Sequence, residues 1–199
     1  MTPVKRFLIT LFGLLAGCTS TSGYLLTWYA DKNPTPKQFD LCHGYSCRYK
    51  ASVSLPDATW QKITLLFAEE NLSAEQERQH IAQAISLLEQ QAGEISGIST
   101  DLPKSPNFKD PYGQQDCIDE TVNTSTYLKM LQADHLLRWH RISPPARRGY
   151  LVDGRWPHNT ATIEALSSGE RYAVDSWPGA NSQAPEIKRL SAWYQEGRH

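Results

Sequence analysis

The chain has 199 residues and a formal net charge of −1, with 40% hydrophobic and 21% charged residues. This length allows one domain of ordinary size, and the composition supports a packed core and argues against extensive disorder. Because acids and bases are nearly balanced and no basic stripe is visible, nucleic acid is excluded as an expected partner.

Residues 1–17 have the pattern of an export signal. Lys5 and Arg6 are followed by an apolar run at 7–16 that is too short to span a bilayer comfortably. Leu15-Ala16-Gly17-Cys18 then resembles a bacterial lipobox, whose cysteine is acylated and becomes the first mature residue. We therefore expect a lipoprotein signal peptide with lipidation at Cys18; an ordinary cleaved signal is the alternative.

The residues after the lipobox indicate where the protein works. Thr19 stands where a retained enterobacterial lipoprotein carries Asp, so the resemblance implies an anchor in the outer membrane that faces the periplasm of a Gram-negative cell. Residues 18–36 are rich in Ser, Thr and Gly and then Pro, which predicts a tether. The folded domain is expected at 37–199.

The cysteine count singles out one thiol. Cys42 and Cys47 are separated by four residues that include Gly44, and in an oxidising compartment this spacing predicts a small disulfide loop. A metal site built from the two cysteines and His43 lacks a clear fourth ligand and is the weaker alternative. Cys117 is left unpaired, and a catalytic thiol is one reason for an exported protein to keep one.

The first half of the domain is predicted to be mainly helical. A short strand is expected at 48–55, and a helix begins at Pro56-Asp57-Ala58. Ser73, with Gln76 three residues on, has the pattern of a capping box for a second helix that ends at Gly93. A proline-containing loop over residues 97–112 follows.

A helix over 117–133 is the element around which the chain is organised. Asp116 is a good N-cap residue, and Asp119 and Glu120 are acids of the kind favoured in a first turn. Cys117 therefore lies where the helix dipole and unpaired N–H groups favour a thiolate. Since the three nearby carboxylates oppose this effect, the thiol needs a base.

The rest of the chain is predicted to form mainly strands. A strand that starts near His140 is expected to end at Pro144-Pro145, and residues 149–156 predict a strand and a turn at Asp153-Gly154. Strands at 158–166 and 171–177 form a hairpin. With a tight turn between them, His158 and Asp175 are about four residues out of register, which a bulge or a longer loop would absorb. Residues 182–199 predict a short amphipathic segment that packs back on the domain.

Three motifs give the chain a family resemblance. They are Asp-Cys-x-Asp-Glu at 116–120, His-Asn-Thr-Ala at 158–161 and Ala-Val-Asp-Ser-Trp at 173–177. A cysteine on a helix followed by His and then Asp on strands is the order of papain-like thiol enzymes. Over residues 42–193 the chain resembles the transglutaminase-like cysteine proteinase superfamily, and within it a family of bacterial transglutaminase-like proteins.

This resemblance implies a fold and a set of roles. The fold would be α+β, a transglutaminase-like or papain-like core with N-terminal helices packed on an antiparallel sheet. Cys117 would be the nucleophile, His158 the base, and Asp175 the residue that holds the imidazole tautomer. The Cys117 N–H and either Gln115 or Gln114 would bind the oxyanion. No cofactor and no metal are implied.

The favoured function is a lipid-anchored thiol hydrolase or acyltransferase that acts on peptide or protein amide bonds in the cell envelope. Hydrolysis is favoured because the compartment is wet and no second-substrate lysine site is visible. The partners would be a peptide or protein substrate and the membrane through its anchor. The alternative is a non-catalytic envelope lipoprotein that uses the same fold for binding. An oxidoreductase built on Cys42 and Cys47 is disfavoured because the motif is not Cys-x-x-Cys.

Overall fold

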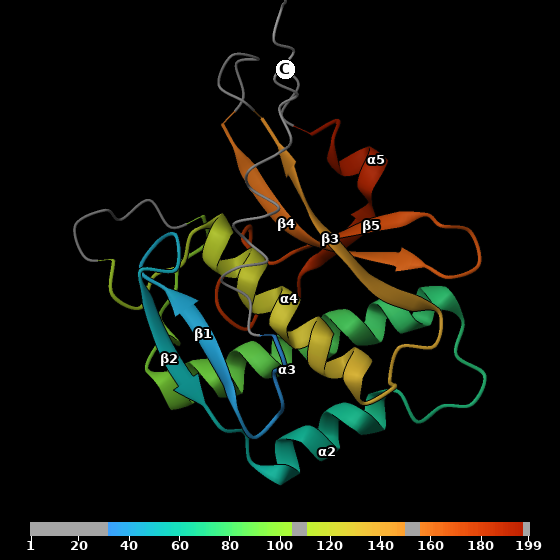
Figure 1. Ribbon diagram of the computed structural model, residues 1–199, viewed down its shortest axis with the longest axis horizontal. Coiled ribbons are helices and arrows are strands. Elements are labelled where there is room, and N and C mark those ends of the chain that lie inside the picture. The colour runs from blue at the N-terminus through green and yellow to red at the C-terminus, as the bar shows by residue number, and fades with distance from the viewer. Residues whose placement is uncertain (1–31, 105–110, 150–155, 197–199) are drawn as a thin grey trace, which may run out of the picture.

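The computed structural model describes residues 32–104, 111–149 and 156–196 (Figure 1). The signal peptide, Cys18, the tether up to residue 31 and the turn predicted at Asp153-Gly154 lie outside the described residues. Within the described part, no helix is both long and apolar enough to cross a membrane. The end of the tether already belongs to the domain, because Pro34 is buried and the Pro36 carbonyl accepts a hydrogen bond of 2.8 Å from the Leu55 N–H.

The described strands form two antiparallel sheets. Strands β1 (Phe39–His43) and β2 (Tyr49–Val53) make a hairpin in which Phe39 pairs with Val53 and His43 with Tyr49. The second sheet has the order β3-β4-β5-β6, and its members are β3 (His140–Arg148), β4 (His158–Ala165), β5 (Arg171–Asp175) and β6 (Glu186–Arg189). Together with the helices, this establishes the α+β class.

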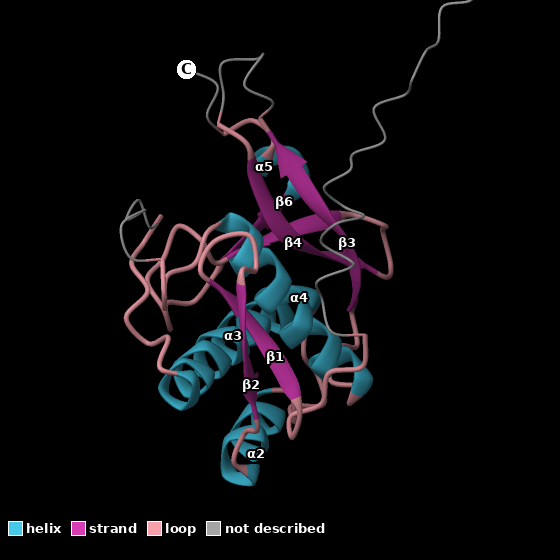
Figure 2. Ribbon diagram, turned by 60° about the vertical axis from the view of Figure 1, so that its left-hand side comes forward, coloured by secondary structure: helices cyan, strands magenta, loops and turns pink. Residues whose placement is uncertain are grey.

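Helix α4 (Cys117–Ala133) lies between the two sheets (Figure 2). It contacts β1 on one side and β4 on the other, while α3 (Ala74–Ser96) packs against α4, β2 and β6. The short helix α2 (Asp57–Leu66) covers α3, and α5 (Leu190–Trp193) packs on β5 and β6. A helix that is enclosed in this way has no solvent face, and every residue from Asp119 to Leu128 is buried.

Several buried polar residues of α4 have hydrogen-bond partners, although the buried Thr126 Oγ1 has none among the described residues. Thr121 and Ser125 donate hydrogen bonds of 2.6 Å to the carbonyls one turn before them. Asn123 reaches across to β1, where its Oδ1 accepts from the Cys42 N–H at 2.7 Å and its Nδ2 donates to the Cys42 carbonyl at 2.9 Å. The unpaired edge of β1 is thereby tied to the central helix, and the site at the start of α4 is fixed to both sheets.

Two sequence expectations were wrong in their boundaries. Helix α3 continues through Gly93 and ends at Ser96, with Gly97 in the left-handed conformation at φ 77°. Gly93 is required for close packing instead, since a Cβ there would lie 2.9 Å from the Asn181 Nδ2. Strand β3 continues through Pro144-Pro145, because it is an edge strand whose register shifts between Ser143 and Ala146.

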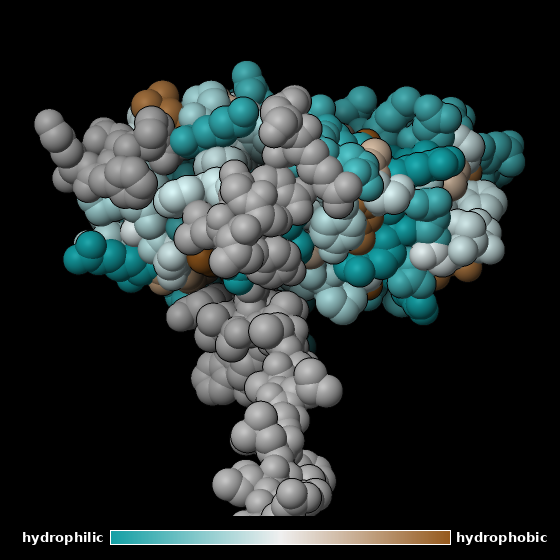
Figure 3. Space-filling model, turned by 90° about the horizontal axis from the view of Figure 1, so that it is seen from above, coloured by the Kyte–Doolittle hydropathy of each residue, from teal (hydrophilic) through white to brown (hydrophobic). Residues whose placement is uncertain are grey.

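Two strands had no counterpart in the sequence analysis. Strand β1 was not predicted, and the C-terminal amphipathic segment contains β6 before α5. The main hydrophobic core lies where α3 and α4 meet the two sheets, and its fully buried side chains include Ile81, Ile85, Leu88, Leu128, Leu131 and Ile163. The face seen in Figure 3 is mostly hydrophilic, with small hydrophobic patches.

Candidate active site

Cys117 is the first residue of α4, and it is the free cysteine of the described residues. The Asp116 Oδ1 accepts hydrogen bonds of 2.9 Å from the N–H groups of Ile118 and Asp119. The Asp119 carboxylate accepts in return from the Asp116 N–H at 3.2 Å. This capping box starts the helix at Cys117 and leaves the thiol half-buried at its N-terminus.

His158 and Asp175 are brought together by the β4–β5 hairpin. His158 begins β4 and Asp175 ends β5, and the His158 Nε2 lies 2.7 Å from the Asp175 Oδ2. Ala161 pairs with Val174, so the register places Asp175 level with Thr160, two residues from His158. Side chains two residues apart share one sheet face and can meet diagonally, which removes half of the expected mismatch. Both side chains are nearly fully buried.

The second imidazole nitrogen is the unusual atom of the site. The His158 Nδ1 is buried and has no hydrogen-bond partner among the residues that the structure describes. The Cys117 Sγ instead contacts the next residue of the strand, with the Asn159 Nδ2 at 3.7 Å. His158 is therefore hydrogen-bonded to Asp175, while the thiol of Cys117 contacts Asn159. There is no hydrogen bond between the Cys117 thiol and the His158 imidazole. Catalytic hydrogen bonds are often open in the absence of substrate and close when it binds.

The surroundings of Cys117 hold its proton in place. Burial, helped by the negative charges of Asp116 and Asp175 and opposed by the N–H groups of Asn159, raises the pKa of the thiol to about 11. The start of the helix alone does not produce a thiolate here. A thiolate here would require a base, as the acidic flanks of the cysteine indicate in the sequence, and His158 is the imidazole of this cluster.

Two tryptophans enclose the imidazole. The ring of Trp177 lies 4.8 Å from that of His158, and the ring of Trp193 lies 5.4 Å from it on α5. Trp193 is wholly buried, and its Nε1 donates a hydrogen bond of 2.8 Å to the Asp175 Oδ2. Trp177 belongs to a motif that the sequence analysis singled out. Asn159 likewise belongs to the motif at 158–161, although it was given no role there. Trp193 did not stand out as a site residue, because only the folded chain brings it there.

The two candidate glutamines have different surroundings. Gln114 is committed to the preceding loop, where its Nε2 donates to the Thr100 carbonyl at 3.1 Å and its Oε1 accepts from the Leu102 N–H at 3.3 Å. The Gln115 Oε1 accepts a hydrogen bond from Asn123. The Gln115 Nε2 then has no hydrogen bond to any residue that the structure describes. Gln115 is therefore the better placed of the two to donate to an oxyanion.

Cys42 and Cys47 form the disulfide that their spacing predicts. This excludes the metal site, since oxidised sulfurs are poor ligands and the His43 Nδ1 accepts from the Gly113 N–H at 3.4 Å. Residues 44–47 all have positive φ, which turns their N–H groups inward. The N–H groups of Tyr45 and Cys47 donate to Asp119 at 2.8 and 2.5 Å. The disulfide loop thus holds the start of the helix that carries Cys117.

Replacing Cys42 and Cys47 together with serine should reduce the free energy of unfolding by about 2 kcal/mol, because the unfolded chain is no longer closed into a loop. Urea denaturation followed by far-UV circular dichroism measures this change. Unchanged denaturation midpoints would show that Asn123 and Asp119 hold the loop without the covalent bond.

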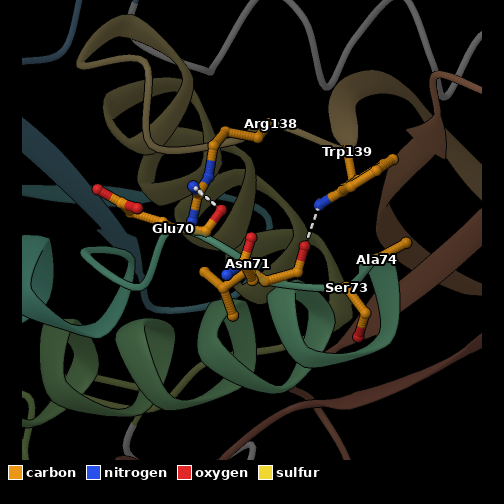
Figure 4. Close-up of a pocket in the computed structure, with 7 residues that line it drawn as sticks. Glu70, Asn71, Ser73, Ala74, Arg138 and Trp139 are labelled. Carbon is orange, nitrogen blue, oxygen red and sulfur yellow. Dashed lines mark hydrogen bonds between the residues drawn. The ribbon is translucent and has the colours of Figure 1, made fainter.

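A surface hollow of about 480 Å³ lies away from this cluster (Figure 4). Two of its side chains are already engaged, because Arg138 donates to the Glu70 carbonyl at 3.1 Å and Trp139 donates to the Leu72 carbonyl at 2.5 Å. None of the three predicted catalytic residues lines it; the lining residues are Glu70, Asn71, Leu72, Ser73, Ala74, Arg138 and Trp139. The hollow lies between the α2–α3 connection, with the start of α3, and the two residues before β3.

In comparisons with known proteins, no family model, curated protein or solved structure matches the chain.

Proposed function

We propose that this protein is a cysteine hydrolase or acyltransferase of transglutaminase-like, papain-like architecture, acting on peptide or protein amide bonds through Cys117, His158 and Asp175. One observation carries the proposal. The free cysteine at the start of the central helix lies beside a buried His–Asp pair whose second imidazole nitrogen has no partner within the described part of the chain. A buried polar atom without a partner costs free energy, so an active site is a reason to keep one.

The geometry supports a defined sequence of proton transfers. With its Nε2–H directed to Asp175, a neutral His158 has its lone pair on Nδ1, which can take the proton of Cys117. The thiolate attacks the amide carbonyl, and the N–H of Cys117 and the Nε2 of Gln115 stabilise the oxyanion. The imidazolium then gives its proton to the leaving amine. Water, deprotonated by His158, cleaves the thioester and restores the thiol.

The cell envelope is the proposed place of action. The lipobox ending at Cys18 supports a lipid anchor, and Thr19 after it supports the outer membrane. The Cys42–Cys47 disulfide supports an oxidising compartment. In that wet compartment water is the abundant acceptor, so we favour hydrolysis over acyl transfer to a lysine. The mechanism requires no cofactor.

Iodoacetamide alkylation of Cys117 as a function of pH, read by mass spectrometry on the mature chain carrying Cys18→Ser, tests the proposal. We expect selective modification of Cys117 well below about pH 8.5, the ordinary thiol range, because an imidazolium pair stabilises the thiolate. His158→Ala should remove this reactivity. His80→Ala is the matched control, since the Nδ1 of His80 is also buried without a partner and lies outside the site.

The alternative is a binding lipoprotein without catalysis, and two observations favour it. The thiol has no hydrogen bond to His158, and burial raises its pKa to about 11. Under this alternative, alkylation of Cys117 would become fast only at high pH and would be the same in His158→Ala. An unchanged cellular phenotype of Cys117→Ser would point the same way.

A further inference from the structure

The C-terminal helix reaches the candidate triad through a single side chain. Trp193 ends α5, is wholly buried, and donates from Nε1 to the Asp175 Oδ2 at 2.8 Å. The same oxygen lies 2.7 Å from the His158 Nε2. One carboxylate oxygen thus accepts from both the imidazole and the indole, and the two rings lie 5.4 Å apart at 40°.

The indole itself is held firmly. The Arg148 guanidinium lies 4.3 Å from the Trp193 ring centre and donates to the Trp193 carbonyl. Arg148 also binds the Glu196 Oε2 at 2.7 Å, and Glu196 in turn binds Lys188 of β6. Arg148 of β3 therefore contacts both the ring and the backbone of Trp193, and Glu196 holds Arg148 in place. These contacts give the indole N–H a defined direction.

A second donor on one carboxylate oxygen has a specific consequence. With His158 as its one donor, Asp175 could rotate and allow the imidazole to flip. With the oxygen fixed by Trp193, the imidazole keeps Nε2–H toward Asp175 and leaves Nδ1 free for the thiol proton. A neutral N–H also draws charge from the carboxylate, so that the proton stays on the imidazole. Because Trp193 is buried, water cannot replace its N–H.

We propose that Trp193 is a positioning residue, which fixes the Asp175 carboxylate and through it the tautomer of His158. The proposal deepens the proposed function and rests on it for its catalytic meaning. It also makes the C-terminal segment a part of the site, although residue 193 lies 18 positions after Asp175 in the chain.

Trp193→Phe tests the inference, because it keeps an aromatic ring and removes the N–H. The tautomer of His158 is read from the 15N chemical shifts of its two ring nitrogens. We expect distinct protonated Nε2 and bare Nδ1 signals in the unmodified mature chain, and mixed tautomers in the variant. The alkylation rate of Cys117 at about pH 6.5 should fall about 10-fold, the value of one hydrogen bond to a charged group.

Trp60→Phe is the matched control. The Trp60 Nε1 also donates to a carboxylate, the Asp134 Oδ2, at 2.7 Å, but at the far end of α4. Its replacement should leave both the His158 signals and the alkylation profile unchanged. The same tautomer and the same pH profile in Trp193→Phe as in the unmodified chain would overturn the inference.

Two further readouts keep the outcome clear. If Trp193→Phe fails to fold, the pH titration of the unmodified chain decides: the Trp193 indole N–H resonance must move together with the His158 signals, and a resonance that stays still overturns the inference. If Cys117 reacts slowly while the His158 tautomer still depends on Trp193, the proposed function fails and the positioning role stands. If Cys117 reacts fast, and Trp193→Phe changes neither its alkylation rate nor the His158 tautomer, the proposed function stands and the positioning role is overturned.

Discussion

Replacing Asp175 with alanine should lower the alkylation rate of Cys117 at about pH 6.5 by about 100-fold, the lower end of the usual contribution of acid–base catalysis. The substitution removes the acceptor of both the His158 Nε2 and the Trp193 Nε1. The imidazole can then flip, and the imidazolium that must accompany the thiolate loses its nearest negative charge. The rate is measured by mass spectrometry over a pH series.

Asp175→Asn should have a smaller effect, about 10-fold. A single oxygen accepts both donors, and the amide oxygen of asparagine can take its place; only the charge is lost. Asp134→Ala serves as the control, because it removes the acceptor of the Trp60 indole without touching the site. If Asp175→Ala reacts as fast as the unmodified chain, then Cys117 is activated without the His–Asp pair and the proposed triad is incorrect.

The central helix could be predicted because its signals are local. The capping box of Asp116 and Asp119 sets its first residue, and the predicted bounds 117–133 are those of α4. The start of α3 was predictable for the same reason, since Ser73 and Gln76 exchange the two hydrogen bonds of a capping box. Such pairs are three residues apart, so the rest of the fold has little influence on them.

The boundaries that were wrong depend on distant parts of the chain. Gly93 has the pattern of a helix end, yet it lies inside α3 because Asn181 packs against it. Pro144-Pro145 would break a central strand and is accepted here because β3 lies at the edge of the sheet and has a bulge. Neither the neighbour of Gly93 nor the position of β3 in the sheet is visible in the sequence.

In the site, too, some features could be predicted from the sequence and others depend on distant contacts. The order of Cys117, His158 and Asp175 was a sequence signal, and the structure joins His158 and Asp175 directly. The sequence did not indicate which of the two glutamines is better placed, because the loop at 100–102 binds Gln114 and Asn123 binds Gln115. Trp193 was predicted only as part of the amphipathic segment at 182–199, with no role in the site. Its role depends on a contact that exists only after β6 and α5 have packed against the hairpin.

The buried carboxylates lead to the second large prediction: the protein should become less stable as the pH rises from about 5 to about 8. Burial raises the pKa of Glu89 to about 8, that of Asp101 to about 7 and that of Asp119 to about 8. Burial also raises the pKa of Glu120 well above its ordinary value, and the neighbouring Glu89 raises it further. Asp119 and Glu120 lie on α4, which begins with Cys117, while Glu89 lies on α3 and Asp101 accepts from the Gln115 N–H at 2.6 Å.

The direction follows from proton counting. Each of these acids releases its proton near pH 4 in the unfolded chain and only at higher pH in the folded protein, so the folded state binds more protons between these values. Their contribution is complete below about pH 4 and is lost as the pH rises toward 8, at up to about 1.4 kcal/mol per pH unit for each group. Burial lowers the pKa of His43, which opposes the trend below its ordinary value of 6.5.

Urea denaturation at constant ionic strength, repeated from about pH 5 to 8, measures the slope of the unfolding free energy against pH. Glu89→Gln should reduce this slope by the contribution of about one bound proton, which is about 1.4 kcal/mol per pH unit. The amide can keep contacts with Ser176 and Ser182 but does not titrate. Glu94→Gln, at an exposed position of the same helix, should leave the slope unchanged. A stability that is flat or rises over this range would mean that the buried acids are ionised in the folded protein. The negative charge around Cys117 would then be larger, and its activation would depend even more on His158.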